Sequence, residues 1–345
     1  MVRLHATFAA GGAALCLALA GCSTEETASQ SASTDGPTIV TAMYPMQYIA
    51  DSVGGDRVNS VSLAEPGVDS HDLELTPQQI TDVTDADVVV YISGFSPALD
   101  SAVSEYAGDR AIDVMALVPT LSGGGGHDHD EEGHSDEEGH SDEEGHSDEE
   151  GHSDEEGHSD EEGHSDEEGQ NDKTASVDPH VWLSPVNMVT ISEAVANRLI
   201  EVDPDSADQY RADNNTLTTE LEELDTKWRK GTKNCESRDL VVSHQAFGYL
   251  ADRYGFGQFG ISGLSPEEEP SPTAIAAAAD FVNDNDVKTI YYESQIDPGV
   301  AQTVADETGA QTGVLDPLEL APQQGDYITV MRSNLAAVQE GQPCQ

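Results

Sequence analysis

The twelve histidines of this chain are unevenly distributed, and their positions are the first pointer to chemistry. Eight lie between residues 127 and 164 and one lies near the N-terminus, so only His71, His180 and His244 remain. Each stands just after an apolar, strand-like segment or where a loop meets a helix, which is where α/β sheets place binding residues. A single histidine in such a loop is more often hydrogen-bonded than functional. Three of them, beside a dense histidine segment, indicate metal binding, because neutral imidazole binds divalent transition metals.

The dense histidine segment extends from Ser122 to about Asn171. It begins with glycines and His-Asp-His-Asp, and then repeats Gly-His-Ser-Asp-Glu-Glu six times between residues 133 and 168. Because it has no apolar side chains to bury, we predict a disordered insertion over residues 122–172. Its candidate ligands are His127, His129, His134, His140, His146, His152, His158 and His164.

Each repeat offers one imidazole and three carboxylates, which are ligands for divalent cations. We expect the insertion to bind several ions weakly, since an unfolded chain loses conformational entropy at every site that it orders. The alternative is a solvated acidic linker without a binding role.

The chain is strongly acidic, with a formal net charge of −53. The insertion holds 22 of the 67 acidic residues, so 45 acids remain elsewhere against 14 bases. Such a surface repels a phosphate backbone, which excludes ordinary nucleic-acid binding. Attraction of cations and adaptation to salty surroundings both remain possible reasons for the charge.

The first 22 residues have the pattern of an export signal. Arg3 precedes an apolar stretch from Phe8 to Ala20, which is too short for a permanent membrane span. The stretch ends in Leu-Ala-Gly-Cys at Cys22, which resembles a bacterial lipoprotein cleavage box. The resemblance implies that Cys22 carries a lipid and that residues 23–36 form a flexible tether. We therefore expect an extracytoplasmic protein anchored to the outer face of the cytoplasmic membrane; an ordinary signal peptide is the alternative.

Two cysteines remain in the predicted globular part, Cys235 and Cys344. A pair of cysteines in an exported protein is most simply a disulfide. A metal role would need partner cysteines at short spacing, which the sequence lacks.

Length and patterning predict two domains. Short apolar segments at residues 38–42, 58–63, 88–92, 111–114, 240–243, 257–261, 287–292 and 311–315 are expected to form strands. Helices are expected to begin at Thr76-Pro77, Ser96-Pro97, Ser184-Pro185, Gln245, Ser271-Pro272, Asp297-Pro298 and Asp326. This alternation predicts parallel sheets flanked by helices.

Between the two sets of strands, a helix is expected to open at Asp203-Pro204 and to continue to about Lys230. Its apolar residues, from Tyr210 to Trp228, recur at helical spacing. The prediction is an α/β fold of two lobes, residues 37–203 and 233–345, joined by a long rigid connecting helix at residues 204–232.

Several blocks of the sequence resemble one family. They are the loop ending in His71, residues 178–185 (Asp-Pro-His-Val-Trp-Leu-Ser-Pro), residues 243–250 (Ser-His-Gln-Ala-Phe-Gly-Tyr-Leu), residues 292–295 (Tyr-Glu-Ser-Gln) and residues 315–319 (Leu-Asp-Pro-Leu-Glu). On these blocks the chain is similar, from about residue 38 to its end, to the solute-binding lipoproteins of zinc and manganese ABC importers. The insertion, and a histidine rather than a carboxylate at position 244, resemble the zinc branch.

The resemblance implies that His71, His180 and His244 are the metal ligands. The fourth position varies in the family between a carboxylate and water, and Glu319 is expected there because of its distance after His244. Asp316 and Glu293 are the other candidates, and Glu293 could instead accept a hydrogen bond from an imidazole. Position 70 departs from the family, which commonly has proline before the first histidine where this chain has serine.

Three imidazoles and a carboxylate suit tetrahedral Zn(II), whereas Mn(II) favours more oxygen ligands. We therefore expect a monomeric, non-enzymatic protein that captures Zn(II) and delivers it to an ABC importer permease. The alternatives are a manganese-type importer protein, a passive metal buffer or adhesin that works through its repeats, and a zinc hydrolase. The sequence contains neither an HExxH motif nor a phosphate-binding GxxxxGK[ST] loop.

Overall fold

The computed structural model describes residues 36–64, 71, 73–123, 177–266, 269–294 and 297–344. The export signal, Cys22, residues 23–35 of the tether and all eight histidines of the insertion lie outside this part of the chain. Among the described residues, no helix is both long enough and apolar enough to cross a membrane.

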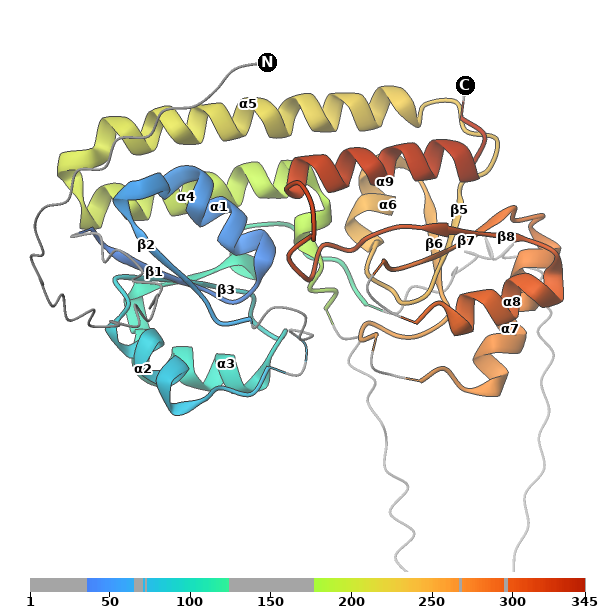
Figure 1. Cartoon of the computed structure of the whole chain (residues 1–345), viewed down its shortest axis with the longest axis horizontal. Helices are drawn as coiled ribbons and strands as arrows, with labels where there is room; N and C mark the ends of the chain where they lie inside the picture. The colour runs from blue at the N-terminus through green and yellow to red at the C-terminus, as the bar shows by residue number, and fades with distance from the viewer. Residues whose placement is uncertain are drawn as a thin grey trace, which may run out of the picture. The chain divides into compact units, whose positions relative to one another are not determined.

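The first lobe is built on a four-stranded parallel sheet (Figure 1). Its strands are β1 (Thr38–Thr41), β2 (Asn59–Ser62), β3 (Val88–Tyr91) and β4 (Ala111–Asp113), in the order β2-β1-β3-β4. The two central strands are made of buried, β-branched residues such as Ile39 and Val89. Such apolar runs are typical of strands covered on both faces, so this part of the fold was predictable from the sequence.

Helices α1 (Tyr44–Gly54), α2 (Pro77–Asp85) and α3 (Pro97–Ala102) flank this sheet, with α1 on one side and α2 and α3 on the other (Figure 1). Thr76 and Ser96 cap α2 and α3 with their hydroxyl groups, as their Ser/Thr-Pro signals predicted. Helix α1 was not predicted from the sequence. Its N-cap residue is Met43, which has no capping side chain, so the usual polar start signal is missing.

The second lobe repeats this plan. Its parallel strands are β5 (Asp239–Val242), β6 (Gly257–Gly260), β7 (Thr289–Tyr292) and β8 (Gln311–Val314), in the order β6-β5-β7-β8. They are flanked by α6 (Gly248–Tyr254), α7 (Pro272–Asp284), α8 (Gly299–Thr308) and α9 (Tyr327–Gly341). The helix expected from Gln245 begins at Gly248 instead, because the backbone NH of Gln245 donates to Gly263 O and holds that residue in the preceding loop.

Two long helices, α4 (Pro185–Val202) and α5 (Ala207–Gly231), pack along each other (Figure 1). The expected helix from Pro204 was wrong at its start: residues 204–206 form a separate 3₁₀ turn, and α5 begins at Ala207. Helix α5 contacts α1 of the first lobe and α9 of the second. Its buried stripe contains the predicted residues, and the Trp228 Nε1–H donates to Met331 O at 3.1 Å.

Two further links fix the end of α5 to the second lobe. A disulfide joins Cys235 to Cys344, just beyond α9. The buried carboxylate of Asp225 on α5 accepts two hydrogen bonds from Arg253 of α6, at 2.9 and 3.0 Å. The connecting helix is thus held along its length by both lobes.

One continuous hydrophobic cluster occupies much of the interior. It includes Met46 of the first lobe, Met188 of α4, Leu224 of α5 and Met331 of α9, so both lobes contribute to it. A smaller cluster lies around β5, β7, α7 and α8. Because protein interiors are close-packed, a shared core opposes wide separation of the lobes.

Candidate metal centre

His180 stands on a turn that is fixed by its own neighbour. The carboxylate of Asp178 accepts hydrogen bonds from the His180 backbone NH at 2.9 Å and from its ring Nδ1 at 2.8 Å. The imidazole is fully buried. Because Nδ1–H is used to donate to Asp178, the Nε2 atom of the ring is left for other chemistry.

His244 follows β5 and is arranged in the same way. Its Nδ1 is hydrogen-bonded to the carboxylate of Glu293, which follows β7 and also accepts from Ser243 Oγ at 3.0 Å. Both His244 and Glu293 are buried. Neighbouring parallel strands end at the same edge of a sheet, and this brings the two residues together from 49 positions apart.

Glu319 lies where the imidazoles converge. Its Oε1 atom is 3.1 Å from His180 Nε2, 3.2 Å from His244 Nε2 and 3.5 Å from His71 Nε2. The Glu319 side chain is 4% exposed, so these interactions are largely buried. Four of the sequence-predicted site residues are thus brought together.

The backbone before Glu319 is unusual. Leu318 is buried and adopts φ 61°, a conformation that residues other than glycine rarely adopt. The Trp182 Nε1–H donates to Pro317 O at 2.7 Å, and the Leu318 NH donates to Asp316 Oδ1 at 2.8 Å. The first bond attaches the Glu319 loop to the His180 turn, and the second stabilises the loop itself.

His71 reaches the site from the first lobe and packs on aromatic rings. Its ring centroid is 4.1 Å from that of Phe95 and 5.5 Å from that of His180. The side chain is 11% exposed, more than the other two imidazoles. The residues just before it, 65–70, lie outside the described part of the chain.

The spacing of the ligand atoms fits a small tetrahedral ion. A tetrahedron with metal–ligand distances of about 2.0 to 2.1 Å has edges of about 3.3 to 3.4 Å. The three Nε2–Oε1 distances, 3.1, 3.2 and 3.5 Å, lie close to such an edge. The donor atoms fall into two groups that share Glu319: those of His71, His180 and Glu319 lie within 4.8 Å of one another, and so do those of His244, Glu293 and Glu319.

The charges in the site compensate one another. Burial alone would lower the pKa of His244, but its hydrogen bonds to Glu293 and Glu319 outweigh burial and raise that pKa to about 10. The pKa of His180 is raised against its burial by Asp178 and Glu319 in the same way. Burial would raise the pKa of Glu319, yet the histidines hold it well below its ordinary value. Without metal, the ionised carboxylate of Glu319 thus favours the protonated forms of His180 and His244.

The two alternative ligands also have partners in this region. Glu293 is hydrogen-bonded to His244 Nδ1, and its carboxylate lies within 4.8 Å of the donor atoms of His244 and Glu319, so both expectations for it remain predictions. Asp316 accepts from Ser294 Oγ at 2.7 Å and from the Leu318 NH at 2.8 Å, and so supports the loop before Glu319. Sequence reasoning missed Asp178. The available signal was the Asp-Pro-His order, in which an aspartate can accept from the backbone NH two residues later.

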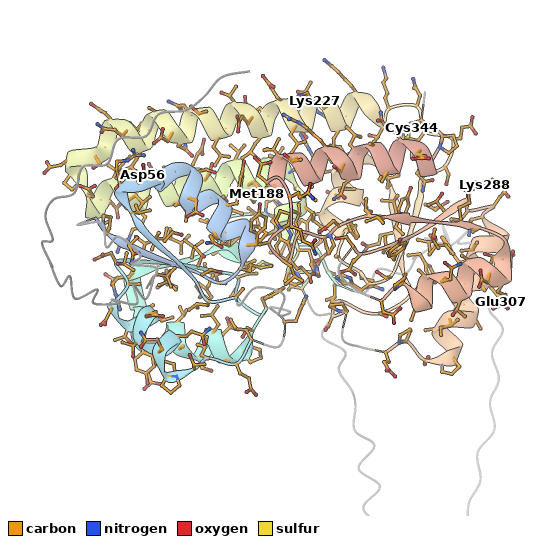
Figure 2. All side chains as sticks on the ribbon, viewed as in Figure 1. Asp56, Met188, Lys227, Lys288, Glu307 and Cys344 are labelled. Carbon is orange, nitrogen blue, oxygen red and sulfur yellow. A yellow bond between two sulfur atoms is a disulfide. The ribbon has the colours of Figure 1, made fainter. Side chains whose placement is uncertain are left out.

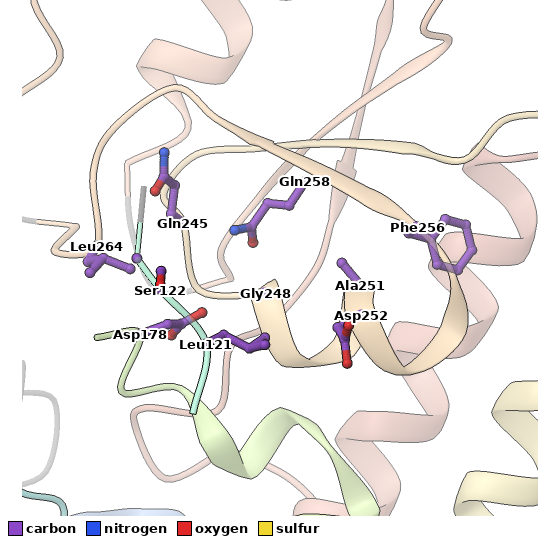
Figure 3. Close-up of a pocket in the computed structure, with 11 residues that line it drawn as sticks. Leu121, Ser122, Asp178, Gln245, Gly248, Ala251, Asp252, Phe256, Gln258 and Leu264 are labelled. Carbon is purple, nitrogen blue, oxygen red and sulfur yellow. The ribbon is translucent and has the colours of Figure 1, made fainter. Parts of the chain in front are cut away.

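Two cavities adjoin the site. One, of about 260 Å³, is lined by Tyr44, Gln47, Ser62, Ala64, Glu319, Leu320 and Ala321, so it leads from the surface between the lobes to Glu319. The other, of about 370 Å³, lies against Asp178, beside Ser122 and Gly123, where the chain leaves toward the insertion (Figure 3). Asp178 thus separates His180 from this second cavity.

A comparison with known protein families matches residues 39–341 to the family described as zinc-uptake complex component A, periplasmic (ZnuA). The high-affinity zinc uptake system protein ZnuA of Bacillus subtilis is 33% identical over 310 residues, which cover 88% of this chain and 86% of that protein. The zinc-binding lipoprotein AdcA of Streptococcus pneumoniae is 30% identical over 95% of this chain, but this chain spans only 59% of its length.

Among solved structures, the laminin-binding protein of Streptococcus agalactiae matches with a TM-score of 0.68 and 26% identity. The match covers 89% of this chain and 99% of that one. That protein is described as bifunctional, with adhesin and metal-transporting activity. The two-lobed α/β fold predicted from the sequence is confirmed by this likeness.

Proposed function

Because this chain belongs to the family of periplasmic zinc-uptake components, we propose that it captures one Zn(II) ion with high affinity through His71, His180, His244 and Glu319 and delivers it to the permease of an ABC importer. The ion is the cargo of the protein. Two of its ligands come from each lobe, so the ion is bound between them.

One observation carries this proposal: the Nε2 atoms of three histidines from distant parts of the chain approach the same oxygen of Glu319 within 3.5 Å. The Nδ1 atoms of His180 and His244 are occupied by carboxylates, which fixes their tautomer and makes the imidazoles stronger ligands. Zinc displaces the protons that the imidazoles and Glu319 share in the metal-free protein.

The donor set also supports zinc over manganese. Three nitrogens and one carboxylate oxygen suit a d¹⁰ ion such as Zn(II), which has no geometric preference of its own. Manganese prefers more oxygen ligands and a higher coordination number. Carboxylate ligands beyond Glu319 would be needed for it, and Asp178 and Glu293 are already bound to imidazoles.

Release to the permease is proposed to need only a small change. The lobes share a hydrophobic cluster and are joined by α5, which opposes wide hinge opening. Glu319 lines the cavity of about 260 Å³ between the lobes, so a small movement there exposes one ligand first. A lipid on Cys22 would keep the loaded protein at the outer face of the cytoplasmic membrane, close to the permease.

The acidic insertion is proposed to raise the cation concentration near the site without forming the tight site itself. A hydrolytic role is not proposed, because catalytic zinc keeps one position open for water, and we propose Glu319 for that fourth position. Adhesion is the second candidate activity, favoured by the bifunctional streptococcal neighbour.

Zinc competition titration of a shortened protein tests the proposal. Because Ser122 and Val177 already pair in an antiparallel bridge, residues 124–176 can be replaced by a two-residue turn. We expect one tight zinc site to remain, and His180→Ala or His244→Ala to abolish it. A passive buffer that works through the repeats predicts the reverse, namely loss of tight binding on shortening and no effect of either substitution.

A further inference from the structure

The two ends of the insertion are joined by hydrogen bonds, and we call this pairing of Leu121-Ser122 with Val177-Asp178 the insertion stem. Ser122 and Val177 form an antiparallel bridge, and the Asp178 NH donates to Leu121 O at 2.9 Å. The hydroxyl of Tyr249, from α6 of the second lobe, bridges both sides of the stem. It accepts from the Leu121 NH at 3.1 Å and donates to Asp178 O at 2.9 Å.

Asp178 belongs to the stem and to the metal centre at once. Its backbone is held by Leu121 and Tyr249, while its carboxylate holds both the backbone NH and the ring of His180. Helix α6 is also shaped to this carboxylate, because a Cβ atom on Gly248 would lie 2.3 Å from Asp178 Oδ2. Figure 3 shows Gly248 and Asp178 on adjoining walls of the cavity next to the stem.

We propose that Tyr249 is a positioning residue for the metal centre: its hydroxyl fixes the insertion stem and, through Asp178, orients His180 toward the cation. The inference rests on the proposed function, since it takes His180 to be a zinc ligand. Tyr249 touches neither the imidazole nor the cation site in this arrangement. It links the stem, which comes before His180 in the chain, to the second lobe, which supplies His244 and Glu319.

The hydroxyl is well suited to this role. Tyr249 is 5% exposed, and its burial, together with the nearby Asp178, raises its pKa to about 12, so it stays protonated and able to donate at neutral pH. Phenylalanine at this position keeps the ring and its packing but removes the bridge between Leu121 and Asp178. The two backbone groups then lose a buried partner, and the turn that carries His180 gains freedom.

Loss of the Tyr249 hydroxyl is expected to make zinc release faster. Partners that orient a ligand from outside the coordination sphere change metal affinity about 10- to 100-fold, and Tyr249 acts one bond farther out, so about tenfold is expected. Association is governed mainly by the negative field and should change little. The affinity loss should therefore come from the dissociation rate.

The experiment uses the full-length protein with Zn²⁺ and, as a spectroscopic probe, Co²⁺. Tyr249→Phe is compared with Tyr254→Phe, a buried tyrosine of the same helix whose hydroxyl donates to Asp225 at 3.3 Å. We expect Tyr249→Phe to release zinc about tenfold faster and to shift the ligand-field bands of bound cobalt, and Tyr254→Phe to change neither. Unchanged release and unchanged bands in Tyr249→Phe, or equal changes in both variants, overturn the inference.

A double-mutant cycle tests whether Tyr249 affects zinc binding through Asp178. If Tyr249 acts through this residue, Tyr249→Phe has no further effect in an Asp178→Ala background, and additive effects overturn the inference. Asp178→Asn serves the same purpose if the alanine variant does not fold. His180→Ala separates the two claims. If this variant still binds zinc tightly, the proposed function is contradicted. If it no longer binds zinc tightly but Tyr249→Phe changes neither zinc release nor the cobalt spectrum, only the role of Tyr249 is contradicted.

Discussion

The Nε2 atom of His180 lies 3.1 Å from the Oε1 atom of Glu319, although the two residues are 139 positions apart and belong to different lobes. The contact is kept by neighbouring bonds. The Trp182 Nε1–H reaches Pro317 O at 2.7 Å, and the Tyr327 hydroxyl donates to Trp182 O at 2.6 Å. Trp182 and Tyr327 are both buried. The cation site is therefore supported by polar contacts between the lobes that do not involve the ligands themselves.

Loss of the carboxylate behind His244 should weaken zinc binding without removing a ligand. Glu293→Gln keeps the size of the side chain but removes the charge that holds His244 Nδ1. We expect an affinity loss of about 10- to 100-fold by competition with a chelator. Glu307→Gln, an exposed glutamate on α8 of the same lobe (Figure 2), is the control and should bind as the wild type does. Equal affinity in both variants would show that Glu293 does not act on the site.

Zinc binding should release protons at neutral pH. The pKa of His244 is raised to about 10, so this imidazole is a cation at neutral pH before zinc arrives, and the raised pKa of His180 shifts it toward the cationic form. Release of about one to two protons per ion is expected at pH 7, and the apparent affinity should fall as the pH is lowered. Calorimetry in buffers of different ionisation enthalpy measures this number. Binding heat that does not depend on the buffer would contradict the proposed charge state.

The stability of the metal-free protein should also depend on pH through these groups. The raised pKa of His244 contributes stability that is complete below its ordinary value of 6.5 and is lost as the pH rises toward about 10. The lowered pKa of Glu319 contributes stability above its ordinary value of 4.5, which is lost on acidification. Together they are greatest between pH 4.5 and 6.5.

Thermal unfolding of chelator-treated protein checks this dependence. The midpoint should fall between about pH 6 and about pH 9, and the fall should be smaller in His244→Gln, which has no proton to lose there. If the thermal midpoint falls equally with pH in the wild type and in His244→Gln, then His244 does not cause the fall.

The carboxylate of Asp225 should contribute to the fixing of α5. It is buried and accepts from both Arg253 and the Tyr254 hydroxyl. Asp225→Ala is expected to lower the free energy of unfolding by about 2 to 3 kcal/mol, less than for a fully buried pair because Arg253 can still reach water. Glu223→Ala breaks only an exposed pair with Lys227 on the same helix and should cost about 0.5 kcal/mol or less. Urea unfolding measures the free energy of unfolding of the two variants. Similar losses of stability in both would contradict the role of Asp225 in fixing α5.

The parts of this fold that were predictable are those with local signals. The strands around Val89 and Val241 are short runs of apolar residues, and the helices after Thr76, Ser96 and Ser271 begin with a hydroxyl cap followed by proline. Helix α1 was missed because Met43 provides no such cap. The 3₁₀ turn at residues 204–206 was missed because Asp203-Pro204 gives the same signal for a single turn as for a helix.

The candidate site was predictable in its residue types and not in its geometry. The three histidines could be chosen because so few lie outside the insertion and the first residues. The contacts around the imidazoles were harder to predict. Glu293 depends on the adjacency of β5 and β7, and Tyr249 on the packing of α6 against the insertion stem. Such contacts come from tertiary packing, which leaves no periodic pattern in the sequence.

The most direct test of the account is a crystal of the zinc-loaded protein, with the ion located by anomalous scattering at the zinc absorption edge. We expect a single ion between the lobes, about 2.0 to 2.1 Å from the Nε2 atoms of His71, His180 and His244 and bound to a carboxylate oxygen of Glu319. An ion bound elsewhere, or one that contacts fewer than three of these imidazoles, would contradict the central claim.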